Sequence, residues 1–570
     1  MNVLVVIPKD INNIIPLIFE YKKKIKSIHL AYDTSVCEFE KALDLKNGLI
    51  KLNNKYSLNW DIKLYPINED KKEHIKRLEK IDFNYLFLAE NTDVTLSILL
   101  SALTLQKNGT IYSYDKGENT YNVIAKEIFE NRQIKNNLKL EDYLTMLNYE
   151  IEEKKTLNDI KSKKKLVFKT IESNNLKDPV IKGALGSLNA LKNGKIEKSI
   201  LGSIFEEYIF WQTIKFDFDD IWLNVKIISE KLDKEEIKNE IDILAIKNNT
   251  IFIFEVKRGT LAPFKIGEYK KTPKTLGINV IYKLDSIMSI FGRYSRGIII
   301  NQNFNSKTKS FSTNLIKRAK ENNILIYEFK KFEFHQLKNI LLDFKVFERV
   351  FLLGGKDLEM KTIKEILEKF DLKFYNKNLS WNNAKLSAYK KYFNEIEHFY
   401  GIELTEDITP PKYYTSIDHH NYKRFKLSSL EQIAKLLNYK LSRKEKLVAI
   451  NDREHILGMK KFGASNKEIE DIRKKERRLQ GINEKEELQA IKDIENGEVV
   501  DGVLVIYTKN NNFSPIADRV FDKEVIIYND KELNYYGKRV HLLVEHFKDL
   551  IDKKLAYFGR GFFGVLKDPL

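Results

Sequence analysis

The stretch NEIDILAIKNNTIFIFEVKRG, residues 239–259, decides the fold of the middle of this chain. Two apolar runs, EIDILAI and IFIFEVK, flank the polar residues KNNT, which is the pattern of a β-hairpin. Asp242 lies early in the first predicted strand. Glu255 and Lys257 lie two residues apart in the second, so their side chains share one face of the sheet. Two carboxylates beside a lysine suit a divalent cation with oxygen ligands, Mg²⁺ or Mn²⁺, which would polarise a phosphodiester while the lysine orients or helps deprotonate a water.

An ordinary solvent-facing edge strand is the alternative for this motif, because a Glu and a Lys two residues apart occur often by chance. Three features favour the metal site: the hairpin distance of Asp242, the apolar flanks, in which unpaired charge is costly, and a predicted helix at 202–214. That helix, GSIFEEYIFWQTI, carries the acidic pair Glu206 and Glu207 on its apolar face.

With these residues, the segment 196–300 resembles the core of PD-(D/E)xK nucleases. The resemblance implies that Glu206 is the helical acid, with Glu207 as the competing choice. It also implies that Asp242, Glu255 and Lys257 are catalytic and that Asp242 and Glu255 hold the metal. A restriction-endonuclease-like α/β core over residues 196–340, hydrolysing DNA, RNA or both, follows as an expectation.

Near the N-terminus, short apolar runs at 2–7, 26–33, 60–67 and 83–90 alternate with charged, helix-compatible segments. This alternation predicts a doubly wound parallel sheet. Such sheets bind ligands beyond the carboxyl ends of their strands, so the polar residues after the first and fourth strands are the candidates. These residues are Lys9, Asn12, Asn91, Thr92 and Thr95. An ordinary surface role is the alternative for the first two.

The segment NVIYKLDSIMSIFGRYSRGIIIN, residues 279–301, resembles the downstream part of such nucleases where they are fused to a CARF sensor domain, as in the ancillary nucleases of type III CRISPR systems. This resemblance implies that residues 1–120 form a Rossmann-like CARF domain that dimerises and binds a cyclic oligoadenylate as an allosteric activator in antiviral defence. The loop NTDVT, residues 91–95, lacks the glycines common in that family, and Asp93 would oppose phosphate at a helix N-terminus.

Two further parts complete the predicted organisation. Charged, helix-compatible sequence fills residues 121–195, which we expect to form a helical connector. A last domain is expected over residues 345–570, beginning with VFERVFLLGG, which is typical of a strand entering a glycine turn.

This C-terminal part carries a second group of candidate ligands. Asp418, His419 and His420 directly follow the strand-like run KYYTSI. Upstream, Asp357 and Glu359 follow VFERVFLLGG. Downstream, SSLEQIAKLLNY predicts a helix, and KLVAINDREH is expected to place Asp452 after another strand.

In this order the residues resemble DHH phosphoesterases, with Asp407 one candidate for the acid of the second motif. The resemblance implies a manganese pair held by Asp357, Glu359, Asp418, His419, His420 and Asp452. Glu359 departs from the family's Asp. The tail YFGRGFFGV resembles the glycine loop of DHHA1 domains but has phenylalanine in place of its histidine. A degenerate, purely structural descendant is the alternative. Either contact with substrate phosphates or ordinary surface pairing is expected for Asp518, Arg519, Arg539 and Arg560.

Length and composition limit the possible classes of protein. A chain of 570 residues with 43% hydrophobic residues predicts several folded domains and excludes a disordered protein. The net charge of +17 gives limited support to a polyanionic partner. Cys37, the only cysteine, excludes an internal disulfide framework and a thiolate zinc site. With no signal-like or membrane-spanning run, we expect a cytoplasmic protein that does not bind membranes.

The sequence therefore predicts a multi-domain α/β protein that is a homodimeric, Mn²⁺- or Mg²⁺-dependent nuclease, activated by a cyclic oligoadenylate and acting on DNA, RNA or both. One alternative is a DHH-type phosphoesterase that acts on cyclic or linear oligonucleotides through the C-terminal region. The other is a non-catalytic nucleotide-sensing scaffold.

Overall fold

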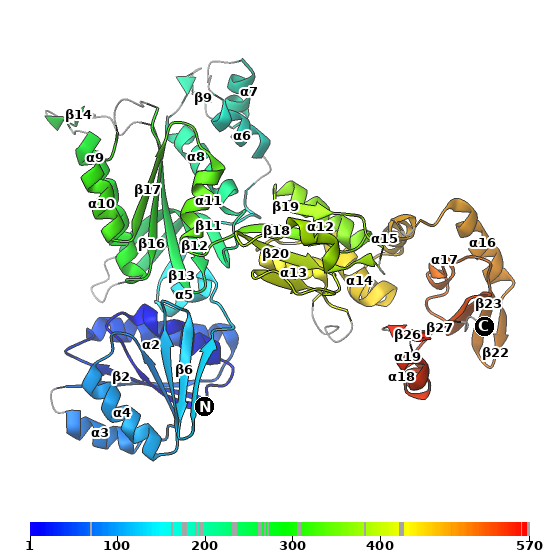
Figure 1. Ribbon diagram of the computed structural model, residues 1–570, viewed down its shortest axis with the longest axis horizontal. Coiled ribbons are helices and arrows are strands. Elements are labelled where there is room, and N and C mark those ends of the chain that lie inside the picture. The colour runs from blue at the N-terminus through cyan, green and yellow to red at the C-terminus, as the bar shows by residue number, and fades with distance from the viewer. Residues whose placement is uncertain are drawn as a thin grey trace. The chain divides into compact units, whose positions relative to one another are not determined.

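A computed structural model describes most of the chain (Figure 1). The residues outside this description are 69–70, 161–163, 174–178, 189–190, 193–194, 197, 231–235, 260–264, 267–268, 271–272, 305–308, 381–382, 421–426, 480, 554, 560 and 567–570. Arg560 therefore lies outside the described residues. The chain forms two compact units, unit 1 at Met1–Glu348 and unit 2 at Arg349–Leu570. None of the described helices combines the length and the hydropathy that spanning a bilayer requires.

Unit 1 begins with a seven-stranded sheet of order β3-β2-β1-β4-β5-β6-β7, drawn in blue and cyan in Figure 1. Its strands are β1 Asn2–Val6, β2 Ser27–Asp33, β3 Asp61–Ile67, β4 Tyr85–Ala89, β5 Thr110–Asp115, β6 Thr120–Ala125 and β7 Ile128–Gln133. Its helices are η1 Ile11–Asn13, α1 Ile15–Tyr21, α2 Phe39–Tyr56, α3 Lys71–Glu79 and α4 Val94–Gln106.

The continuous apolar run of β1 is explained by burial on both faces. Val3 and Val5 belong to a core that includes residues of α1 and α2, while Leu4 and Val6 belong to a second core with residues of α3 and α4. Strands β1 to β5 pair in parallel, which confirms the predicted doubly wound sheet.

The expected helical connector at 121–195 is wrong in its first part. Residues 120–133 form the antiparallel strands β6 and β7 at the edge of the first sheet. After α5 (Leu140–Met146), strand β8 (Glu150–Lys155) joins the edge of the second sheet. The strand pattern was hard to recognise because every residue of β7 is exposed, so that β7 shows no alternation of buried and exposed side chains. Helices follow only later, at α6 (Lys164–Glu172) and α7 (Pro179–Ser187).

The second sheet of unit 1 has the order β17-β16-β13-β12-β11-β8. Its remaining strands are β11 Asp220–Glu230, β12 Glu236–Lys247, β13 Thr250–Arg258, β16 Arg296–Gln302 and β17 Ile324–Phe329. Its helices are α8 Lys198–Thr213, α9 Pro273–Ile290, α10 Thr313–Glu321 and α11 Phe334–Leu342. Two short strand pairs, β9 Leu191–Lys192 with β10 Lys195–Ile196 and β14 Lys265–Ile266 with β15 Tyr269–Lys270, complete unit 1.

Strands β12 and β13 are antiparallel, which confirms the predicted hairpin. Asn248 and Asn249 both have positive φ, as a two-residue hairpin turn requires. The turn packs inside unit 1, because the Asn249 side chain accepts a hydrogen bond from the backbone of Leu138 and donates one to Asn119 near the first sheet. One hydrophobic core extends from β1 through α5 to β13 and α9, so the two sheets of unit 1 are packed together.

Unit 2 contains two smaller sheets. The first is parallel at its edges, has the order β19-β18-β20-β21, and consists of β18 Glu348–Leu353, β19 Lys373–Asn376, β20 Glu397–Ile402 and β21 Tyr414–Ile417. The helical elements between and after these strands are α12 Leu358–Lys369, η3 Leu386–Tyr392, α13 Ser429–Leu436, α14 Arg443–Lys461, α15 Asn466–Leu479 and α16 Glu484–Glu495.

The second sheet of unit 2 has the order β22-β23-β24-β25-β27-β26. Its elements are β22 Glu498–Val500, β23 Val503–Tyr507, α17 Ser514–Ala517, β24 Val525–Tyr528, β25 Glu532–Tyr536, α18 Val540–His546, α19 Lys548–Asp552, β26 Ala556–Gly559 and β27 Phe562–Leu566.

The prediction that Asp452 follows a strand is wrong, because KLVAINDREH lies within helix α14. Ser442 and Glu445 form a reciprocal capping box that starts this helix. A short apolar run such as LVAI fits a strand or a buried helix equally well, so the cap, and not the run, determines the local structure.

Candidate functional site

The hairpin of unit 1 brings three predicted catalytic residues together. The Lys257 Nζ lies 2.6 Å from Glu255 Oε1 and 3.3 Å from Asp242 Oδ2. The backbone N–H of Val256 donates to Asp242 Oδ2 at 2.7 Å, which fixes that carboxylate against the second strand. Glu255 is almost fully buried, with a side chain 1% exposed. Two strands adjacent in sequence thus place both carboxylates around one ammonium group.

Glu206 on α8 belongs to the same electrostatic environment. Burial, and next the charge of Asp242, raise the pKa of Glu206 to about 7. Burial and then Glu255 also raise the pKa of Asp242. The competing residue Glu207 accepts a hydrogen bond from Trp211 Nε1 at 3.1 Å. Glu206 therefore interacts electrostatically with the hairpin, and Glu207 is bonded to Trp211.

Lys257 is protonated in this arrangement. Burial alone lowers its pKa, but Asp242 and Glu255 outweigh that effect and raise it above the ordinary lysine value. Its role is therefore electrostatic or orienting, since an ammonium group of raised pKa cannot accept a proton from water near neutral pH.

A second lysine at this site was missed by sequence reasoning. Lys283 on α9 donates to both carboxylate oxygens of Glu255, at 3.1 Å each. The only signal available was its place on the helix that follows the second strand of the hairpin, where its spacing resembles any exposed lysine.

The residues of this site fit a divalent cation. Asp242 and Glu255 supply carboxylate oxygens, the donors that Mg²⁺ and Mn²⁺ prefer. Burial is the main cause of the raised pKa values of Asp242 and Glu206, and a bound cation would favour their charged forms.

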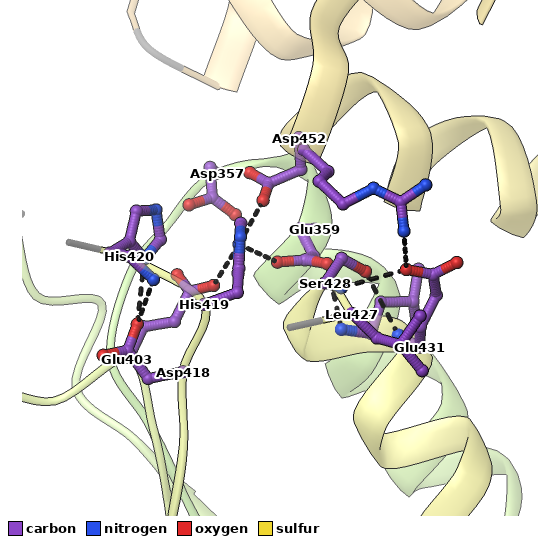
Figure 2. Close-up of polar contacts among 12 residues, drawn as sticks. Asp357, Glu359, Glu403, Asp418, His419, His420, Leu427, Ser428, Glu431 and Asp452 are labelled. Carbon is purple, nitrogen blue, oxygen red and sulfur yellow. Dashed lines mark hydrogen bonds and ion pairs between the residues drawn. The ribbon is translucent and has the colours of Figure 1, made fainter. Parts of the chain in front are cut away.

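In unit 2, the segments that follow β18, β20 and β21 converge with helix α14 around His419 (Figure 2). Its Nε2 lies 2.6 Å from Asp452 Oδ2, 3.5 Å from Glu403 Oε1 and 3.7 Å from Glu359 Oε2. Glu403, His419, His420 and Asp452 each offer one ligand atom within 4.8 Å of the others. These residues could together ligate a metal ion, and Asp357 points toward them from the N-terminus of α12.

Asp357 Oδ2 is buried and makes no hydrogen bond with the described residues. Glu359 Oε2, Glu403 Oε1 and Asp452 Oδ2 all face one atom, the Nε2 of His419, at 3.7, 3.5 and 2.6 Å. Burial first, and then the charges of Glu403 and Asp452, raise the pKa of Asp357 to about 8. Buried polar atoms without partners are costly, and metal ions satisfy such atoms, so these residues fit one or two divalent cations.

His419 carries a positive charge that partly neutralises the carboxylates of this cluster. Burial lowers its pKa, but Asp452, Glu359 and Glu403 together raise it to about 12, so the imidazole is protonated among the carboxylates. A metal ligand must be a neutral imidazole, and a cation binding here would therefore replace the proton.

Glu403 was missed in the sequence, and Asp407 was the wrong candidate for the second acid. Asp407 lies exposed and bonds Ser387, outside the cluster. Glu403 follows β20 directly, and only glycine fits at position 354 beside it, since a Cβ there would lie 2.3 Å from the carbonyl oxygen of Ile402. The sequence signal for Glu403 was its position as the first acidic residue after an apolar strand.

Asp418 stands beside the cluster and positions one of its members. Its Oδ1 accepts from the backbone N–H of His420 and lies 3.0 Å from His420 Nδ1. Asp418 is thus a neighbour that orients His420, and the structure does not place it among the four grouped ligand atoms.

The predicted sensor residues lie at the carboxyl edge of the first sheet. Lys9, Asn12 and Asn91 line a cleft of about 1120 Å³, together with residues of α2 and the loop after α9. The Lys9 backbone N–H donates to the carbonyl of Asn91, which joins the two loops. The Asn12 side chain is buried and bonded within the protein, to Asp10, Tyr143 and Ile290.

Thr92 and Thr95 lie at the start of α4. The Thr92 hydroxyl bonds the carbonyl of Ala89 and the hydroxyl of Ser97, and Thr95 is exposed. Asp93 caps the helix by accepting from Leu96 N, so this helix end already carries an acceptor.

The polar residues proposed near the C-terminal glycine loop pair within the protein. Asp518 is bound by Arg473 and Arg477, Arg519 contacts Glu487, and Arg539 contacts Glu524.

Comparisons with known proteins give low similarity. No family model matches this chain, and no curated protein is significantly similar to it. Protein VC1899 from Vibrio cholerae has a TM-score of 0.43 at 13% identity, over 60% of this chain and 97% of its own. Can2 from Sulfobacillus thermosulfidooxidans, in complex with cyclic tetra-adenylate, has a TM-score of 0.41 at 12% identity, over 59% and 96%. A type III CRISPR defence DNA nuclease activated by cyclic oligoadenylate has a TM-score of 0.33 at 11% identity, over 53% of this chain and 45% of its own.

Proposed function

We propose that unit 1 is a divalent-metal-dependent nuclease. The observation that carries this proposal is the convergence of Asp242 and Glu255 on Lys257 across one hairpin, with Glu206 electrostatically coupled to them from α8. A phosphodiester is a polyanion whose hydrolysis needs charge stabilisation, an oriented water and a proton acceptor. This site contains residue types for all three.

Each residue has a separate task in this proposal. A cation held by Asp242 and Glu255 would supply Lewis-acid polarisation of the phosphate. The protonated Lys257 neutralises a phosphate oxygen and orients the attacking water. Glu206, whose pKa is about 7, accepts the proton of that water near neutral pH. The polymer is DNA, RNA or both, because none of these groups reads a base edge.

The proposed effector, a cyclic oligoadenylate, would bind in the cleft at the carboxyl edge of the first sheet. Lys9 and Arg293 line this cleft and suit the phosphates of such a ligand, whereas Lys41 and Lys51 pair there with Glu38 and Glu150. The sequence resemblance to CARF sensors supports the same site, and Lys9 and Asn91 are the predicted contacts that line it.

A homodimer is supported by one helix face. Val94, Ile98, Ala102 and Leu105 form an exposed apolar stripe along α4, next to the loop at 91–95, and Val94 and Ile98 are 71% and 63% exposed. A second copy of the chain would cover this stripe. The variant Ile98→Asp is expected to be monomeric by sedimentation, while Val180→Asp on α7 keeps the dimer. A monomeric wild type would contradict the dimer.

A second activity is proposed for unit 2, a metal-dependent phosphoesterase acting on cyclic or short linear oligonucleotides. The cluster of Glu403, His419, His420 and Asp452 favours it, with the buried Glu359 3.7 Å from His419 Nε2. Such an activity would degrade the effector of unit 1.

The experiment that tests the first proposal measures cleavage of supercoiled plasmid and of labelled single-stranded DNA and RNA in Mn²⁺, with and without a panel of cyclic oligoadenylates. Cleavage that depends on one cyclic ligand is the expected result. Cleavage regardless of ligand removes the switch from the proposal, and absence of cleavage in every condition contradicts the nuclease.

A further inference from the structure

Helix α9 lies between the proposed nuclease site and the loops after β1 and β4, which are called the sensor loops below. This position suggests how the site is controlled. Its middle residue, Lys283, bonds both oxygens of Glu255, a carboxylate proposed to hold the metal. Its end, at Ile290, is contacted by the loop after β1. We propose that Lys283 is a latch that lowers metal affinity in the ligand-free protein, and that α9 releases it when the effector binds. This inference rests on the proposed nuclease function.

The latch follows from the charges around Glu255. The carboxylate is buried and already receives Lys257 at 2.6 Å, which is retained in the catalytic arrangement proposed above. Lys283 brings a second ammonium group and occupies lone pairs on both oxygens. A divalent cation approaching Glu255 would meet two positive charges and a carboxylate with few free lone pairs. Withdrawal of Lys283 alone restores a site with one lysine and open carboxylate oxygens.

Both sensor loops hold the segment that follows α9. From the loop after β1, Asn12 Nδ2 donates to the carbonyl of Ile290 at 3.3 Å, and Asp10 Oδ2 accepts from the backbone N–H of Arg293 at 3.1 Å. From the end of β4, Glu90 accepts a hydrogen bond from the hydroxyl of Tyr294. Three residues at or after the helix end, Ile290, Arg293 and Tyr294, are therefore bonded to these two segments.

The contact with Asp10 leaves no room for a side chain at position 292. Gly292 has φ of +78°, and a Cβ there would lie 2.2 Å from Asp10 Oδ2. Lys9, Asp10, Asn91 and Arg293 all line the same cleft. A polyphosphate ligand that draws Lys9 and Arg293 toward itself thus acts directly on the hydrogen bond between Asp10 and Arg293.

Close packing makes α9 suitable for transmitting this displacement. A Cβ at Gly297 on β16 would lie 2.6 Å from Met288 Sδ and 2.9 Å from Leu284 Cδ2, so the helix rests on the strand backbone. Ile281, Leu284 and Ile287 are buried along the same helix. A helix packed in this way shifts as a unit, and movement at its end moves Lys283 with it.

The test measures Mn²⁺ binding by calorimetry on the full chain, with Glu255→Gln defining the contribution of unit 2. Without effector, Lys283→Met is expected to bind Mn²⁺ at the nuclease site about tenfold more tightly than wild type, while Lys317→Met, an exposed lysine change on α10, matches wild type. Equal or weaker binding by Lys283→Met would overturn the latch.

A second experiment asks whether the effect of Lys283 on Mn²⁺ affinity depends on the effector, as a latch requires and a fixed positive charge does not. Cyclic tetra-adenylate is the probe. It is expected to tighten Mn²⁺ binding by about tenfold in wild type, and Mn²⁺ must tighten its binding by the same factor, because coupling is reciprocal. In Lys283→Met, the probe is expected to bind without tightening Mn²⁺ binding further. In Tyr294→Phe, Mn²⁺ binding is expected to stay weak when the probe is present. A gain preserved in both variants would refute the role of α9. Loss of the nuclease itself is read separately, from cleavage by wild type.

Discussion

The two candidate metal sites of this chain differ in how their carboxylates are compensated. In unit 1, Glu255 contacts Lys257 and Lys283, so lysine side chains supply much of the positive charge that a metal would bring. In unit 2, Glu359, Glu403 and Asp452 all lie within 3.7 Å of one protonated nitrogen, the Nε2 of His419, and Asp357 Oδ2 has no hydrogen-bond partner among the described residues. A site balanced by lysines folds without its metal, whereas a site in which one imidazolium faces several carboxylates gains stability from a metal.

The difference also reflects how each site is built. Asp242, Glu255 and Lys257 come from one hairpin and are fixed by local pairing. The cluster of unit 2 needs the ends of β18, β20 and β21 and a turn of α14, which are brought together only by the tertiary fold. We therefore expect substitutions in unit 1 to affect activity with little effect on stability, and substitutions in unit 2 to affect both.

The largest expected effect is loss of cleavage on removing the charges of the hairpin. Asp242→Ala and Lys257→Ala should each lower polymer cleavage by about 10²- to 10⁴-fold, since each removes a group that acts on the reacting phosphate or water. Glu207→Ala is the matched control, because Glu207 bonds Trp211. Gel-based rates measure the effect, and full cleavage by both variants would refute the nuclease site.

The next effect is stabilisation of unit 2 by metal. Mn²⁺ at ~100 times its Kd should add about 2.7 kcal/mol to the free energy of unfolding of unit 2, because it binds only the folded cluster. His419→Ala should abolish this gain, while Asp242→Ala leaves it intact. Calorimetric melting of the full chain follows both transitions. A gain of equal size in His419→Ala would show that the cluster is not the binding site.

A narrower comparison separates Glu403 from Asp407. Glu403→Gln should weaken Mn²⁺ binding to unit 2 by about tenfold or more, the loss expected when one ligand or its support is removed. Asp407→Asn should leave binding unchanged, because Asp407 is exposed and bonds Ser387. The opposite ranking would return Asp407 to the metal site and exclude Glu403.

The smallest expected effect is a pH dependence of stability without metal. The folded state raises the pKa of Asp357 from 3.8 to about 8 and that of His419 from 6.5 to about 12, so it binds more protons than the unfolded chain. The stabilisation is complete below the unfolded pKa of each group and is lost as pH rises toward the folded value. The melting temperature of metal-free unit 2 should thus fall between about pH 5 and 8.

Saturating Mn²⁺ should remove most of this decline, because the ligands then bind as carboxylates and neutral imidazole. His419→Gln should flatten the part of the profile above the ordinary imidazole pKa. A melting temperature that rises over the same interval would contradict the assignment of protons to Asp357 and His419.

Local patterns in the sequence were sufficient for much of unit 1. Alternating apolar runs predicted the parallel strands β1 to β4, and the polar turn at 248–249 predicted the hairpin that carries Asp242 and Glu255. Lys283 could not be identified, because its position beside Glu255 depends on how α9 packs against β16. The strands at 120–133 were missed because all residues of β7 are exposed, so that no alternation of buried and exposed side chains marks this strand.

Unit 2 shows the limit of such reasoning. The sequence indicated His419 and Asp452 as candidates, but the capping box at Ser442 places Asp452 on a helix where a strand was expected. Glu403 was overlooked although it follows an apolar strand, because the second motif was sought further along the chain. Which carboxylates meet is decided by strand order and by the close approach at Gly354, and neither is visible in a single sequence.

The most direct test of two separate sites measures cleavage of labelled single-stranded DNA and RNA in Mn²⁺ and cyclic tetra-adenylate by wild type, Lys257→Ala and His419→Ala. The structure predicts that Lys257→Ala loses cleavage of the polymer and that His419→Ala retains it. Retained cleavage in Lys257→Ala together with its loss in His419→Ala would contradict this account and assign the nuclease chemistry to unit 2.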